Sequence, residues 1–242
     1  MTDDIPALPG LADPKEARKT EPHYLGHRQR LRERFLSNPQ SLPDYELLEL
    51  LLAAAIPQKD VKPIAKGLIE RFGGFAEVIS ADANALAAAD GLGPASAAVL
   101  KVVQEAALRL ARLTVIDRPV IGSWDSLLDY CNAAMARLPI EQFRLLFLDR
   151  KNVLIHEELQ QKGTVDHTPL YPREVVKRAL ELNSSAVIMV HNHPSGDPAP
   201  SRADIEMTRQ VRDALAAVGI ALHDHVIVGR KGHVSFKGQG LL

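Results

Sequence analysis

Two histidines and one aspartate in the C-terminal half are the residues whose types and spacing suggest chemistry. His191 and His193 end an apolar run that begins at Ala186, and Asp204 follows after a loop rich in proline and glycine. Residues two apart on an extended strand face the same side, so the two imidazoles should point together. Two imidazoles and one carboxylate form a ligand set that catalytic zinc uses, with the fourth position left to water. The pattern predicts a divalent metal site, and zinc, one ion per chain, suits these ligands.

The same residues also fit purely structural roles. Ser201 and Asp204 have the spacing of a capping box, in which the serine begins a helix and the acidic residue bonds back to it. A His-x-His pair at the end of a strand also occurs without a metal. The combination favours the metal site, because two histidines leave a buried strand and a carboxylate returns at the start of a helix. An aspartate that caps a helix keeps one oxygen for a metal.

The elements that must position these residues follow two patterns along the chain. Residues 1–22 mix proline, glycine and charges, which predicts a mobile tail. Residues 23–113 have apolar positions at helical spacing, which predicts an all-α domain of about five short helices and a longer last one. Residues 114–122 suit a linker, and residues 123–242 alternate helix and strand patterns, as an α/β domain does. In that last segment we expect helices over 124–137, 172–183 and 201–218, and strands over 143–148, 153–159, 186–190, 220–228 and 233–236.

The composition excludes several classes of protein. The chain of 242 residues is 46% hydrophobic and 24% charged, with a formal net charge of -1, which is typical of globular proteins and unlike disordered ones. The most apolar stretch, 47–56, is too short for a membrane span and contains Glu49. Cys131 is the only cysteine, so we expect a buried packing residue and no internal disulfide. Together with an acidic N-terminus, these features predict a cytoplasmic protein with no membrane partner.

The metal-site pattern resembles a known motif. Its spacing of His-x-His, seven residues, Ser, two residues and Asp is that of the JAMM motif in JAB1/MPN metalloproteases. The longer string HNHPSGDPAPSRAD resembles the bacterial RadC family within that superfamily. The similarity covers about 119–242 and includes GTVDHTPLYPREVVKRALELN and DHVIVG. Upstream, SLPDYELLELLL, ERFGGF and GLGPASAAVLK are similar to the RadC N-terminal region.

The resemblance implies both a fold and residue roles. It implies an MPN domain of cytidine-deaminase-like fold, with a mixed central sheet, for residues 123–242, after a helix-hairpin-helix-like region. It also implies that His191, His193 and Asp204 bind zinc, and that Ser201 helps to stabilise the tetrahedral oxyanion.

The JAMM pattern further implies a glutamate base upstream, at the start of a strand. Glu141 fits best, because it directly precedes the expected strand 143–148 and the sequence from it reads EQFRLLFL. Glu174 is the rival, although an acidic residue there also simply favours the N-terminus of a helix. The remaining alternative is a site with no dedicated base.

The resemblance implies a zinc-dependent hydrolase of JAMM metallopeptidase type, which would cleave an amide or isopeptide bond in a peptide or protein. The loop PSGDPAPS departs from the superfamily in being longer and rich in proline, which leaves the substrate open. The alternative is a DNA-binding repair or recombination protein whose metal site cuts nucleic acid or is not catalytic. A third interpretation is an adaptor that binds peptides without cleaving them.

A glycine-rich turn is the candidate DNA contact. Gly91 and Gly93 resemble a helix-hairpin-helix turn, in which backbone N–H groups at a helix N-terminus suit a phosphate. Lys101 is the first basic residue after the turn, and residues 27–34 form a basic stretch at helical spacing. The alternative interpretations are a tight turn without a ligand and a solvated helix face.

Further histidines repeat the pattern more weakly. His223 and His225 share one face of the expected strand 220–228, where a structural role is favoured over support of the metal site. His167 is interpreted as a loop residue.

Overall fold

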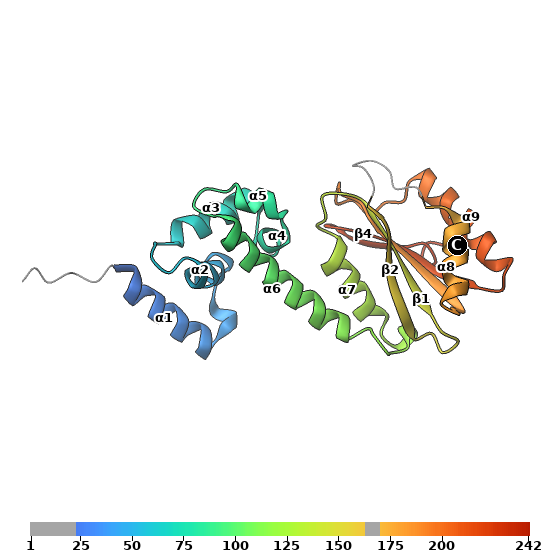
Figure 1. Ribbon diagram of the computed structural model, residues 1–242, viewed down its shortest axis with the longest axis horizontal. Coiled ribbons are helices and arrows are strands. Elements are labelled where there is room, and N and C mark those ends of the chain that lie inside the picture. The colour runs from blue at the N-terminus through green and yellow to red at the C-terminus, as the bar shows by residue number, and fades with distance from the viewer. Residues whose placement is uncertain (1–22, 163–169) are drawn as a thin grey trace, which may run out of the picture.

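Residues 23–162 and 170–242 are described in the computed structural model of the protein (Figure 1). The predicted tail, residues 1–22, and the predicted loop residue His167 lie outside these described residues. A helical part comes first and an α/β part second, and the long helix α6 leads from one to the other (Figure 1). The predicted order of an all-α part and an α/β part is confirmed.

The helical part forms because apolar residues recur at helical spacing between breaks made by proline and glycine. Leu48, Leu52 and Leu100 are fully buried at its centre. The helices are α1 (His23–Ser37), the 3-10 turn η1 (Pro39–Ser41), α2 (Asp44–Ala55), α3 (Lys62–Phe72), α4 (Phe75–Ser80), α5 (Ala83–Ala87) and α6 (Pro94–Leu113).

The α/β part contains a five-stranded mixed sheet in the order β2-β1-β3-β4-β5. β3 pairs in parallel with β4, and the other neighbours pair antiparallel. The expected strands 143–148 and 153–159 are therefore confirmed as β1 and β2, which form an antiparallel hairpin. The elements are η2 (Val120–Gly122), α7 (Trp124–Met135), β1 (Gln142–Leu148), β2 (Leu154–Lys162), α8 (Pro172–Glu181), β3 (Ala186–Asn192), α9 (Arg202–Ala216), β4 (Ala221–Gly229) and β5 (Gly232–Ser235).

The central strand β3 is buried along its whole length, and its two faces contribute to two cores. Ile188 and Val190 pack on the side of α7, whereas Val187 and Met189 pack on the side of α8 and α9. Figure 1 shows α7 on one side of the sheet and α8 and α9 on the other. Because strand residues alternate between faces, His191 lies on the side of α9.

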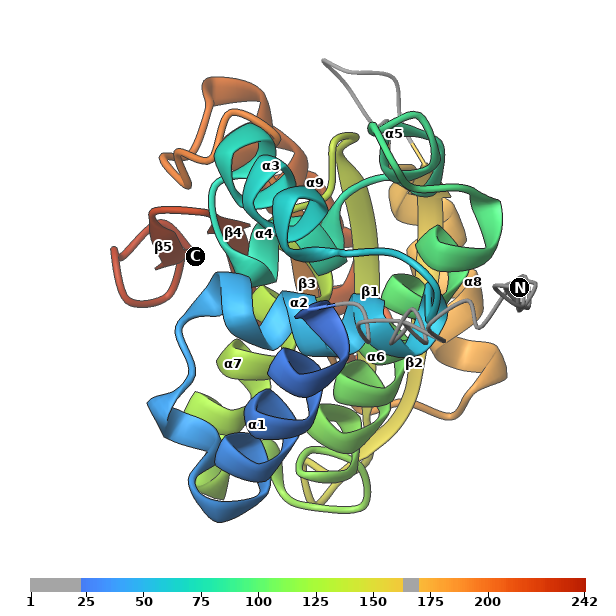
Figure 2. The same ribbon diagram turned by 90° about the vertical axis from the view of Figure 1, so that its left-hand side faces the viewer.

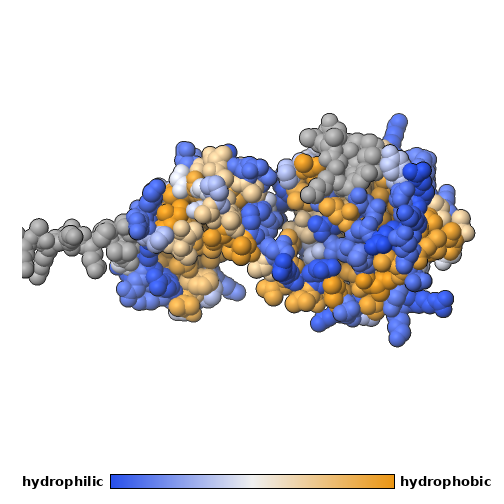
Figure 3. All heavy atoms as spheres, in the orientation of Figure 1, coloured by the Kyte–Doolittle hydropathy of each residue, from blue (hydrophilic) through white to orange (hydrophobic). Residues whose placement is uncertain are grey.

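The segment between the two parts packs onto the α/β part. Val115 and Val120 are buried in the core beside α7, so residues 114–122 are held against the sheet. Leu108 and Ala111 of α6 pack against the same core. Figure 2 shows the helical part in front of the sheet along the long axis, and the surface in Figure 3 narrows where α6 crosses. In the described part of the chain, no helix combines the length and apolar character needed to cross a bilayer.

A buried carboxylate ties this junction together. Glu157 on β2 accepts hydrogen bonds from the Tyr130 hydroxyl at 2.7 Å and from Arg144 Nη1 at 2.6 Å. Arg112 Nε, on α6, lies 3.4 Å from the same carboxylate. The Glu157 side chain is only 8% exposed, so these three partners replace water around its carboxylate.

Replacement of Glu157 by alanine should lower the free energy of unfolding of the α/β part by about 3 kcal/mol, since Arg144 then keeps a poorly solvated charge without its partner. Urea unfolding measured by circular dichroism tests this. Glu158→Ala is the matched control, because Glu158 pairs with Arg178 on the surface and its loss should have little effect. Equal destabilisation by the two variants would contradict the prediction.

Candidate metal centre

His191, His193 and Asp204 meet at one end of the sheet. His191 is fully buried on β3, and His193 follows the strand, where its backbone N–H donates to the Val228 carbonyl at 3.0 Å. Asp204 lies in the first turn of α9. The three side chains offer ligand atoms that all lie within 4.8 Å of one another.

The separations of these atoms suit a tetrahedral metal. The Nε2 atoms of His191 and His193 are 3.0 Å apart. Asp204 Oδ1 is 3.3 Å from His191 Nε2, and Asp204 Oδ2 is 3.5 Å from His193 Nε2. Ligands bound about 2.0–2.1 Å from a tetrahedral zinc are themselves about 3.3 Å apart. The donor set therefore fits zinc in both chemistry and spacing.

Hydrogen bonds on the far side of His193 determine which ring nitrogen carries its proton. His193 Nδ1 lies 2.8 Å from the carbonyl oxygen of Asp197, which only accepts. Nδ1 therefore carries the proton, and the lone pair of Nε2 faces His191 and Asp204. This arrangement, in which the outer nitrogen of a histidine donates to a carbonyl, is typical of metal ligands.

A buried chain of hydrogen bonds orients His191 in the same way. Thr208 Oγ1 donates to the Asp204 carbonyl at 2.5 Å and lies 2.6 Å from His225 Nδ1, from which it accepts. His225 Nε2 then accepts from His191 Nδ1 at 2.8 Å. The lone pair of His191 Nε2 is left pointing at His193. Two lone pairs and a carboxylate thus converge on one point, where a cation would relieve their repulsion.

The titration behaviour of the cluster follows from burial and charge. Burial lowers the pKa of the fully enclosed His225 well below its usual value, so this ring is neutral. Burial alone would raise the pKa of Asp204, but His191 and His193, which donate to its carboxylate when they are protonated in place of binding a cation, outweigh burial and leave that pKa well below its usual value. The same contact with Asp204 raises the pKa of His193.

The capping box uses one carboxylate oxygen of Asp204 and leaves the other to the metal cluster. Ser201 Oγ accepts from the Asp204 backbone N–H at 3.1 Å, and Asp204 Oδ2 accepts from the Ser201 backbone N–H at 2.8 Å. Asp204 Oδ1 remains directed at His191. The two interpretations drawn from the sequence are therefore compatible. In the capping box the Ser201 hydroxyl only accepts, so its proton remains able to donate a hydrogen bond.

Strand pairing brings Glu141 to the same place. β1 lies beside β3, with Phe143 opposite His191, so the register continued by two residues sets Glu141 opposite His193. The charge of Glu141 contributes to the raised pKa of His193, which agrees with this proximity. Glu174 is exposed in the first turn of α8, where it accepts from Arg173 Nε at 3.1 Å.

Asn192 is a residue that the sequence analysis missed. Its buried side chain accepts from the Gln142 backbone N–H at 2.8 Å and donates to the Ile140 carbonyl at 3.2 Å. These bonds hold the backbone on both sides of Glu141. An asparagine at the end of an apolar strand, between two candidate ligands, was the available signal.

The candidate DNA contacts lie apart from this cluster. Gly91 has φ of +80° and approaches Ile64 so closely that a Cβ would lie 2.7 Å from it, which explains this glycine without a ligand. Gly93 is the N-cap of α6. Lys101 Nζ donates to the carbonyls of Ile79 at 3.2 Å and Ala81 at 2.9 Å, and burial lowers its pKa. A phosphate at Lys101 would compete with these two bonds.

The remaining candidates have structural partners. His225 Nε2 accepts from His191 Nδ1, whereas His223 Nε2 lies 2.6 Å from Asn152 Oδ1. Cys131 is buried, and burial raises the pKa of its thiol to about 12, as suits a packing residue.

The sequence is similar to two protein-family models and to curated relatives. Residues 121–241 match the RadC-like JAB domain, and residues 24–98 match the UPF0758 N-terminal model. A UPF0758 protein of Rhodobacter capsulatus is 58% identical over 213 residues, which cover 88% of this chain and 100% of that protein. A UPF0758 protein of Ruegeria pomeroyi is 55% identical over 223 residues, which cover 91% of this chain and 100% of that protein.

Substitution of Asn192 by alanine should loosen the backbone beside Glu141 while the sheet persists. Loss of two buried hydrogen bonds should speed hydrogen exchange at the Gln142 amide by about tenfold or more. The amide of Leu145, in the middle of β1, is the internal control and should keep its rate. Unchanged exchange at Gln142 would show that Asn192 does not hold this segment.

Proposed function

Because this chain belongs to the RadC family, we propose that its C-terminal part is a zinc-dependent hydrolase of JAMM metallopeptidase type. The observation that carries the proposal is the convergence of the His191 and His193 lone pairs on the Asp204 carboxylate, 3.0–3.5 Å apart. These three residues would hold one zinc ion per chain. The bound ion would supply an activated water and a polarised carbonyl group.

Two residues near the ion would supply proton transfer and stabilisation of the oxyanion. Glu141, beside His193, takes a proton from the attacking water and passes it to the nitrogen of the leaving amine. The Ser201 hydroxyl donates a hydrogen bond to the oxygen on which negative charge develops. The carbon–nitrogen bond breaks, and the products are a carboxylate and an amine. The substrate class is an amide or isopeptide bond in a peptide or protein.

The purified full-length protein should contain about one zinc per chain, and His193→Ala should remove most of it, because three protein ligands are needed for tight binding. Elemental analysis of protein prepared without chelators measures this. His233→Ala is the matched control, since His233 is an exposed histidine on β5 outside the cluster. Zinc content that is unchanged in both His191→Ala and His193→Ala would contradict the site.

Glu141→Gln should retain zinc, because Glu141 is not a proposed ligand, but should cleave about 10²–10⁴-fold more slowly, the usual effect of losing a general base. The assay is mass spectrometry of a peptide pool that includes lysine-ε-linked isopeptides, with zinc-loaded protein. Glu174→Gln, the matched control, should keep full activity. Equal rates for Glu141→Gln and the wild-type protein would rule out the role of Glu141, and no cleavage by the wild-type protein would count against the peptidase.

We propose DNA binding by the helical part as a second function. The observation that favours it is the N-terminus of α6, whose N-cap Gly93 has no side chain, so no side-chain cap occupies the backbone N–H groups that follow Pro94. Gly93→Glu should weaken binding of the full-length protein to branched or single-stranded DNA at low salt. A Cβ at Gly93 meets nothing within 4 Å, so the fold should persist. Gly122→Glu controls for added charge, and equal binding by both variants would oppose the proposal.

A further inference from the structure

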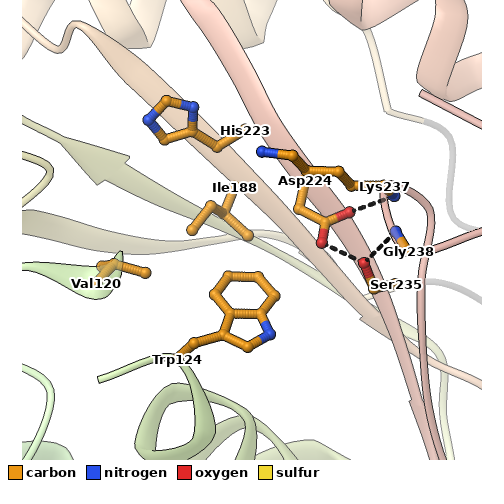
Figure 4. Close-up of a pocket in the computed structure, with 8 residues that line it drawn as sticks. All are labelled: Val120, Trp124, Ile188, His223, Asp224, Ser235, Lys237 and Gly238. Atoms are coloured by element: carbon orange, nitrogen blue, oxygen red, sulfur yellow. Dashed lines mark hydrogen bonds between the residues drawn. The ribbon is translucent and has the colours of Figure 1, made fainter. Parts of the chain in front are cut away.

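A cavity lies on the face of the sheet opposite the candidate metal centre. It has a volume of about 390 Å³ and lies where α7 begins, over β3 and β4. Its apolar walls are formed by Val120, Trp124 and Ile188 (Figure 4). Ile188 faces the side of α7, whereas His191 on the same strand faces the side of α9. The cavity is therefore separated from the metal cluster by the thickness of the sheet.

Buried Asp224 builds the polar end of this cavity. Its carboxylate accepts hydrogen bonds from the Ser235 hydroxyl at 2.5 Å, from the Lys237 backbone N–H at 2.9 Å and from the His225 backbone N–H at 2.7 Å. These bonds hold the turn after β5 against β4. Asp224 is only 3% exposed, and three donors compensate its charge from within the chain.

Lys237 is placed by that turn so that its side chain extends over the cavity toward His223 (Figure 4). Burial and the nearby Lys237 lower the pKa of His223, so the imidazole is neutral near pH 7. Within residues 23–162 and 170–242, the Lys237 ammonium makes no hydrogen bond or ion pair. The cavity therefore combines apolar walls, an indole ring and one ammonium group whose charge no carboxylate neutralises directly.

We propose that this cavity binds a small planar apolar carboxylate, with its ring beside Trp124 and its carboxylate on the Lys237 ammonium. The volume is within the range of small-molecule sites. An aromatic ring gains from an offset or edge contact with the indole, and a carboxylate forms a charge-assisted bond with an ammonium group. A single ammonium suits a singly charged carboxylate better than a phosphate, which recruits several donors. The proposal does not depend on the metal or on hydrolysis.

The test uses the fluorescence of Trp124, which is the only tryptophan of the chain. Benzoate is titrated into the full-length protein, with benzamide as the uncharged probe of the same shape. Benzoate should give a saturable change with a Kd of about 1 mM, as expected for a ligand of this size, and benzamide should bind about tenfold more weakly. No saturable change with benzoate, or equal affinity for the two probes, would overturn the proposal.

Two lysine variants locate the binding. Lys237→Met keeps an unbranched side chain, one atom shorter, but removes the charge, and should weaken the binding of benzoate about tenfold while leaving that of benzamide unchanged. Lys177→Met, on α8 at the opposite face, should bind both probes as the wild-type protein does. Circular dichroism confirms that each variant is folded, which is expected because both lysines are exposed. Wild-type affinity for benzoate in Lys237→Met would place the binding elsewhere and overturn the proposal.

Discussion

Each histidine of the candidate metal centre has its Nδ1 atom engaged in a hydrogen bond, and the geometry of the cluster depends on these bonds. The Asp197 carbonyl accepts a hydrogen bond from His193 Nδ1, and His225 Nε2 accepts one from His191 Nδ1. The Nε2 atoms of His191 and His193 then both direct their lone pairs at the same point. The arrangement is costly without a cation, because a buried polar group needs a partner. The hydrogen bonds to the Nδ1 atoms therefore favour the orientation in which both histidines could bind a cation.

The loop between the histidines and α9 is held by close backbone packing. Gly196 has φ of +87°, which glycine adopts without strain, and its carbonyl lies so near Gly229 that a Cβ there would be 2.5 Å away. Arg230 Nη2 donates to the Ser195 carbonyl at 3.1 Å, and the Lys231 backbone N–H donates to the Gly196 carbonyl at 3.0 Å. The turn between β4 and β5 therefore supports the loop that carries the cluster.

The two faces of β3 and β4 separate two kinds of chemistry. His191 and His225 face α9 in a dense polar cluster, whereas Ile188 and Asp224 face the cavity beside α7. Because successive residues of a strand point to opposite faces, one strand contributes side chains both to the polar cluster and to the cavity. The helical part also contacts the α/β part, because Arg137 Nε lies 2.9 Å from a carboxylate oxygen of Glu77 on α4.

Local spacing in the sequence determined the helical and α/β segments, the same-side pair His191 and His193, and the capping box that starts α9, because neighbouring residues alone set these features. Only the tertiary structure decided that Glu141, and not Glu174, lies beside His193. That choice depends on β1 pairing with β3, a contact between residues about 50 apart. The hydrogen bonds from Lys101 to two backbone carbonyls could not be predicted from the sequence either, because a partner distant in sequence leaves no local periodicity.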